Sequence, residues 1–101
     1  MSDRMKIEFR DKRLALIRTD EAHKTGLPFA VIKSAREKLV VLEAAPDERT
    51  LRNWKSLHYE KLEGAKGKRS IRLNKQFRMV FELDNKEQQP TITVLGIEDY
   101  H

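Results

Sequence analysis

Residues 70–83, SIRLNKQFRMVFEL, decide the fold, because apolar and polar residues alternate on both sides of Asn74-Lys75. This alternation around a pair that suits a tight turn predicts a β-hairpin. Successive side chains of a strand point to opposite faces, so Arg72 and Arg78 are expected to share one open face. The other face is apolar and expected to be buried: Ile71, Leu73, Phe77, Met79, Phe81 and Leu83.

The segments around this hairpin predict the other elements. Met5–Phe9 alternates like a short strand, and residues 1–4 read as an extension. A first helix is expected between Asp11 and Gly26, and a second from Pro28 to Ala45-Pro46, with apolar residues at steps of three and four. The β-branched run Thr91–Ile97 predicts a buried strand. The order βααβββ predicts an α+β fold, two helices on one face of a small, mainly antiparallel sheet.

The connector between the second helix and the hairpin carries Leu51, Trp54 and Leu57 at spacings of three. A lone tryptophan can plug the core or stack on a base, and we expect Trp54 to pack on the core. The segment GAKGKR, residues 64–69, lacks the spacing of a P-loop and precedes a strand. It is expected to be a basic turn.

Composition limits the functional classes. With 101 residues, 39% hydrophobic and 37% charged, the chain is expected to form one soluble domain, residues 1–101. No apolar run approaches the roughly 20 residues that cross a bilayer, so a cytoplasmic location without membrane contact is expected. There is no cysteine, and the three histidines lie far apart. We therefore expect neither a metal nor another cofactor.

The positive charge is concentrated in one stretch. The net charge is +5, but residues 61–78 hold seven basic residues against one acidic residue and the remainder of the chain sums to −1. A local field of this kind suits a polyanion such as RNA, or simply a solvated hairpin. The basic residues are Lys61, Lys66, Lys68, Arg69, Arg72, Lys75 and Arg78.

Two arginines on paired strands can hold a phosphate through charge-assisted hydrogen bonds. RNA carries its own nucleophile, the 2′-hydroxyl, so a protein that cleaves it needs a base, a cation and an acid. His58, Glu60 or Lys61 could position or deprotonate the hydroxyl. Tyr100 or His101 could protonate the leaving oxygen.

Three stretches together resemble the HigB toxins of the RelE/ParE superfamily. They are EKLEG at residues 60–64, SIRLNKQFRMVF at 70–81 and the final EDYH at 98–101. The resemblance implies a type II toxin that cleaves messenger RNA on the ribosome, without a metal. It also implies a HigA-like antitoxin of the helix-turn-helix class. The toxin would contact operator DNA only through this antitoxin.

Carried over residue by residue, the family's Asp-Tyr-His maps onto Asp99, Tyr100 and His101, and its hairpin arginines map onto Arg72 and Arg78. Several members place a histidine where this chain has Glu60, so the identity of the base stays open. Strict alternation separates Tyr100 from its two neighbours unless the strand bulges near Gly96. A ParE-like inhibitor of DNA gyrase and a non-catalytic basic module that binds RNA or the ribosome are the alternatives.

Overall fold

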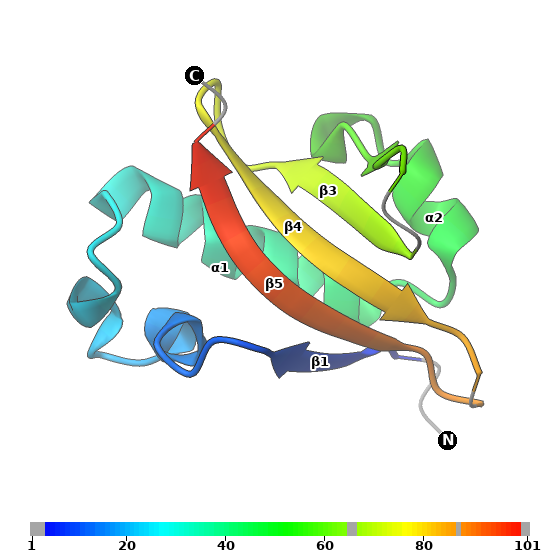
Figure 1. Cartoon of the computed structure of the whole chain (residues 1–101), viewed down its shortest axis with the longest axis horizontal. Coiled ribbons are helices and arrows are strands. Elements are labelled where there is room, and N and C mark those ends of the chain that lie inside the picture. Colours follow the sequence, from blue (N-terminus) through cyan, green and yellow to red (C-terminus); the bar gives the residue numbers. More distant parts are fainter. Residues whose placement is uncertain (1–3, 65–66, 87, 100–101) are drawn as a thin grey trace.

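The computed structural model, which describes residues 4–64, 67–86 and 88–99, has the predicted α+β architecture (Figure 1). No helix within these ranges is long and apolar enough to cross a membrane. The elements in chain order are β1 (Lys6–Phe9), η1 (Leu14–Arg18), η2 (Ala22–Thr25), α1 (Phe29–Ala44), α2 (Glu48–Asn53), η3 (Lys55–Leu57), β2 (Glu60–Lys61), β3 (Lys68–Arg72), β4 (Phe77–Asp84) and β5 (Thr91–Asp99).

The strands form one mixed sheet in the order β1-β5-β4-β3-β2. β1 runs parallel to β5, and the other neighbours are antiparallel. In the hairpin Arg72 is opposite Arg78 and Ile71 is opposite Met79, so the two arginines share one face, as predicted. Figure 1 shows α1 behind β4 and β5 and α2 beside β3. The apolar face of the hairpin therefore lies against α1.

Helix α1 follows the sequence pattern closely. Pro28 precedes it, and the chain leaves the helix at Ala45 before Pro46, where proline disfavours a further helical turn. Its inner side chains recur at helical spacing, and all of them except Ile32 lie in the same core cluster as Ile71, Met79 and Phe81. The buried residues of the helix are Val31, Ile32, Ala35, Leu39 and Leu42.

The predicted continuous helix between Asp11 and Gly26 is wrong, since this stretch forms the two short 3-10 segments η1 and η2. Leu14 and Ile17 are buried, but polar residues follow, and one apolar turn gives too little burial to sustain a long helix. The Thr19 hydroxyl donates to the Leu16 carbonyl at 2.7 Å and closes the first segment. Gly26, at φ 76°, closes the second.

The connector after α1 contains more structure than the sequence predicted. Asp47 caps α2 by accepting a hydrogen bond from the Thr50 amide at 2.9 Å, a favourable N-cap arrangement. Leu51 and Leu57 are fully buried, whereas Trp54 is 46% exposed. The prediction that Trp54 plugs the core is therefore wrong, and the two leucines beside it fill that role.

The hairpin turn is longer than predicted. The Leu73 amide donates to the Phe77 carbonyl at 2.9 Å, so the chain reverses over Asn74, Lys75 and Gln76 rather than over Asn74-Lys75 alone. The side-chain oxygen of Asn74 accepts from the amides of Gln76 and Phe77 at 2.8 and 2.7 Å. This local bonding, typical of asparagine in turns, accommodates the additional residue.

An ion pair between Arg18 and Glu43 fastens η1 to the last turn of α1, with two nitrogen to oxygen distances of 2.9 and 2.8 Å. The hydrogen bonds from Arg18 lower the pKa of Glu43 below its usual 4.5, against an opposing effect of burial. A carboxyl group whose pKa is lower in the folded chain than in the unfolded chain stabilises the fold at pH values above its unfolded pKa. This contribution disappears as the pH falls through its folded pKa.

Glu43→Gln is therefore expected to lower the free energy of unfolding near pH 7, where the wild-type carboxylate is ionised. The difference between the two proteins should shrink below about pH 4.5 as the wild-type carboxyl takes up its proton. Urea unfolding at several values between pH 7 and pH 3 measures this difference. Wild-type and variant curves that stay parallel over the whole range would contradict the ion pair's contribution.

Candidate functional site

The predicted face shared by the two arginines exists. Cross-strand partners place Glu60 with Ser70, Arg72 with Arg78, and Arg78 with Glu98. These pairs lie on the side of the sheet opposite the core residues Ile71, Met79 and Phe81, and we call this side the open face. Like charges directly opposite each other destabilise a sheet, and the Glu60 carboxylate, 3.8 Å from Arg78, offsets part of this repulsion.

Arg78 is the buried member of the pair, only 6% exposed. Its Nε donates to the Ser70 Oγ at 3.0 Å, and its Nη2 donates to the His58 carbonyl at 2.5 Å. The Glu60 carboxylate lies 3.8 Å from the same Nη2. The guanidinium group thus extends from β4 across β3 and holds the segment before β2 against the open face.

His58 lies beside Arg72, whose Nη1 is 3.5 Å from the His58 Nε2. The Arg72 Nε also donates to the Asn74 carbonyl at 3.3 Å. His58 is the one non-glycine residue with positive φ in the described part of the chain, at φ 47°. This left-handed conformation costs on the order of 1 kcal/mol, and such strain is often found at functional positions.

The three candidates for the base divide between the two faces of the sheet. His58 and Glu60 approach Arg72 and Arg78 respectively. Lys61 is opposite Arg69, whose other cross-strand partner is the core residue Phe81. Lys61 therefore belongs to the opposite face, away from the two other candidates.

The remaining basic residues of the predicted RNA-binding set are dispersed. Lys68 is on the open face opposite Glu82, and Lys75 is exposed in the turn. Arg69 is on the other face, where its Nε donates to the Glu48 carboxylate at 2.9 Å. Lys66 falls outside the described residues.

The middle of β5 contains a bulge next to Gly96. Val80 is opposite Gly96 and Phe81 is opposite Val94, so Leu95 is the extra residue. Beyond the bulge, Asp99 is opposite Phe77, which places it on the core side of the sheet. The Asp99 carboxylate accepts a hydrogen bond from the side-chain amide nitrogen of Gln76 at 2.8 Å. The structure does not bring Asp99 onto the face of Arg72 and Arg78, and Tyr100 and His101 lie outside the described residues.

Sequence reasoning passed over Ser70, whose side chain is 1% exposed and accepts the hydrogen bond from Arg78. The signal was its position in the alternation, two residues before Arg72 and on the same face. It also passed over Glu98, the cross-strand neighbour of Arg78. Within the described ranges, no three histidine, aspartate or glutamate side chains gather in a way that could hold a metal ion.

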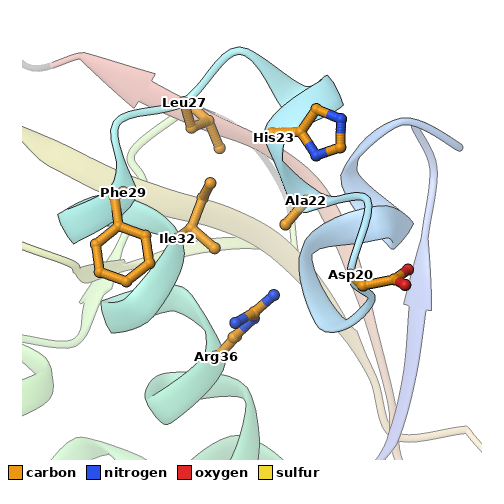
Figure 2. Close-up of a pocket in the computed structure, with 7 residues that line it drawn as sticks. All are labelled: Asp20, Ala22, His23, Leu27, Phe29, Ile32 and Arg36. Carbon is orange, nitrogen blue, oxygen red and sulfur yellow. The ribbon is translucent and has the colours of Figure 1, made fainter.

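A pocket of about 300 Å³ lies elsewhere, between η2 and the start of α1. Figure 2 shows its lining, in which Phe29 is 75% exposed. The Arg36 side chain is already bonded to the carbonyls of Ile17 and Thr19, at 2.6 and 2.8 Å. The pocket is thus a mainly apolar feature, separate from the arginines. It is lined by Asp20, Ala22, His23, Leu27, Phe29, Ile32 and Arg36.

Comparisons with known proteins agree on one class. A family model for HigB-like toxins, RelE-like toxins of the type II toxin–antitoxin system HigB, matches residues 7–94. The chain is 38% identical over 79 residues to Toxin HigB-1 of Vibrio cholerae serotype O1, covering 77% of this chain and 83% of that protein.

Two solved structures share the fold. A YoeB/ParE toxin from Agrobacterium tumefaciens matches with a TM-score of 0.54 and 15% identity, covering 96% of this chain and all of that one. The YoeB-YefM complex from Staphylococcus aureus matches with a TM-score of 0.53 and 20% identity, covering 97% of this chain and 98% of that chain. At these identities the likeness supports the fold alone.

Proposed function

Because the chain belongs to the HigB-like toxins, the RelE-like toxins of type II toxin–antitoxin systems, we propose that it cleaves messenger RNA on the translating ribosome. The observation that carries this proposal is the open face itself. There, two arginines oppose each other, with His58 3.5 Å from one and Glu60 3.8 Å from the other. A fixed cationic surface beside two proton acceptors suits attack on a phosphodiester.

The proposed reaction uses the nucleophile that RNA supplies. The 2′-hydroxyl oxygen attacks the adjacent phosphorus and gives its proton to a base, and the bond from phosphorus to the 5′-oxygen breaks. The 5′-oxygen leaves with a proton from an acid. The products are a 2′,3′-cyclic phosphate and a 5′-hydroxyl.

Roles for the residues follow from their placement. The more accessible Arg72 would contact the phosphate, while the buried Arg78 would hold His58 and add positive potential. His58 is our first choice for the base because its Nε2 is beside Arg72, and Glu60 is the alternative. The acid is proposed from family resemblance to be Tyr100 or His101, with Asp99 completing the terminal motif.

We also propose that the toxin pairs with an antitoxin of the helix-turn-helix class. The family assignment to type II toxin–antitoxin systems supports an antitoxin partner, and the helix-turn-helix class is proposed from the family resemblance. A target on the ribosome would place the toxin in the cytoplasm. Contact with operator DNA would then pass through the antitoxin.

The proposal predicts cleavage that depends on a single hydroxyl group. In a reconstituted translation system, wild-type toxin should cut a defined message and leave 2′,3′-cyclic phosphate ends. Replacing the ribose at the mapped site with 2′-deoxyribose should reduce cutting there to background, because the nucleophile is gone. End mapping and mass analysis of the fragments measure both results.

A message carrying the same substitution one codon away is the matched control and should still be cut. Cleavage that persists at the deoxy position would rule out attack by the 2′-hydroxyl. Intact message together with breaks in DNA inside toxin-expressing cells would favour the gyrase alternative instead.

A further inference from the structure

Tyr59 lies between the two candidate bases, His58 and Glu60, in the sequence. Its side chain is anchored on the opposite side of the chain from theirs. Its ring is half-buried and meets the ring of Phe81 edge to face, with centroids 6.2 Å apart and planes at 62°. Its hydroxyl donates to the carboxylate of Glu48. Its neighbours His58 and Glu60 are exposed. The segment 58–60 is therefore fixed through its middle side chain.

The partners of that hydroxyl form a compact cluster. The Glu48 Oε2 accepts from the Arg69 Nε at 2.9 Å as well as from Tyr59, and the Arg69 Nε lies 3.1 Å from the Tyr59 oxygen. The Glu48 and Arg69 side chains are 17% and 14% exposed. The cluster thus joins three separate parts of the fold: the start of α2, the segment before β2, and β3.

The protonation of the cluster is well defined. Burial opposes ionisation of Glu48, but the hydrogen bonds from Arg69 and Tyr59 together outweigh it and lower the pKa of Glu48. Burial, followed by the hydrogen bond to Glu48, raises the pKa of Tyr59. The carboxylate is therefore ionised and the phenol protonated near neutral pH, which is the state that these hydrogen bonds require.

We propose that Glu48, Tyr59 and Arg69 are positioning residues that hold His58 and Glu60 at the arginines of the open face. This inference rests on the proposed ribonuclease function. Arg78 holds the His58 carbonyl from the open face, and the cluster holds the adjacent Tyr59 from the other face. These two contacts therefore hold the strained backbone at His58 from two sides.

This assignment changes the role of Arg69, which the charge pattern had included among residues that bind RNA. Its guanidinium group is bonded to Glu48 and Tyr59 on the core side of the sheet. A positioning role predicts a specific kinetic effect. Loss of the cluster should slow the chemical step, because small displacements of reacting groups strongly affect rate, and should leave substrate binding by Arg72 unchanged.

Tyr59→Phe is the sharpest test, because it removes one hydroxyl and keeps the ring against Phe81. We expect kcat for cleavage on the ribosome to fall about tenfold, with KM unchanged. Glu48→Gln, which keeps an acceptor oxygen, should be less affected than Glu48→Ala. Glu43→Gln is the matched control, since it removes a carboxylate held by an arginine in a different part of the fold.

A second readout does not depend on catalysis. The nitrogen resonances of the histidine rings should show a shift for His58 in Tyr59→Phe and none for His23, which lines the distant pocket. His58→Gln assigns the His58 signal. Glu43→Gln should shift neither resonance.

The outcomes separate the two proposals. If Tyr59→Phe is folded, keeps the wild-type kcat and leaves the His58 resonance in place, the positioning role is overturned. If wild-type protein cleaves no message but Tyr59→Phe still shifts His58, the proposed ribonuclease fails while the anchoring of His58 stands. An equal fall in kcat for Glu43→Gln would also overturn the inference, because the effect would then reflect general destabilisation.

Discussion

Replacing Arg78 with alanine is expected to lower the rate of messenger RNA cleavage by about 10²-fold or more, the usual effect of removing a group that stabilises developing charge. Arg78 bridges the Ser70 hydroxyl and the His58 carbonyl, so its removal takes away positive potential and releases the backbone of a candidate base at once. Single-turnover cleavage of a defined message in reconstituted translation measures the effect.

Arg78→Lys separates charge from geometry. A lysine keeps the positive charge, but its single nitrogen does not reproduce the planar fork that reaches both oxygens. We therefore expect it to recover only a small part of the lost rate. Arg10→Ala is the control for net charge, because Arg10 is an exposed arginine paired with Glu82 on the same sheet. Near-wild-type cleavage by a folded Arg78→Ala protein would contradict the assignment.

The largest expected loss of stability follows from Phe81→Ala. Phe81 is fully buried, lies in the middle of β4 and meets Tyr59 edge to face. Truncating such a side chain usually costs about 3–5 kcal/mol, a large share of the roughly 5–15 kcal/mol that holds a domain together. Denaturant unfolding followed by circular dichroism measures the change.

Val40→Ala is the corresponding control, since Val40 is 62% exposed on α1. Its truncation is expected to change the free energy of unfolding by less than about 0.5 kcal/mol. Phe81→Leu should fall between the two, because it keeps most of the apolar volume. A loss below about 1 kcal/mol for Phe81→Ala would show that the core rearranges around the missing ring.

The hairpin and α1 could be predicted because their signals are local. Two alternating runs around Asn74 predicted the hairpin and the face of each side chain, although not the length of the turn, and the spacing from Ile32 to Leu42 predicted the helix. Residues 11–26 could not be read in this way, because they hold too few apolar positions to separate an α-helix from shorter turns. The pairing of β1 with β5 joins residues from opposite ends of the chain, and such contacts leave no local pattern.

The candidate site was predictable to a similar extent. Alternation correctly placed Arg72 and Arg78 on one face, and the segment around His58 and Glu60 lies beside them. The burial of Arg78 was not predictable, because it depends on how the backbone at His58 folds over the sheet. The pairing of Arg69 with Glu48 was not predictable either. It joins residues 21 positions apart, through a helix that the sequence did not reveal.

The bulge at Leu95 makes the length of the last strand as important as its composition. Because neighbouring side chains alternate, a shift of one position exchanges the two faces of a strand. The bulge has already made that shift once, and it puts Ile97 and Asp99 on the same side as Met79 and Phe77. A substitution at either position does not change which face of the sheet the neighbouring side chains occupy. Insertion or deletion of a single residue between Leu95 and Asp99 would turn every later side chain to the other surface.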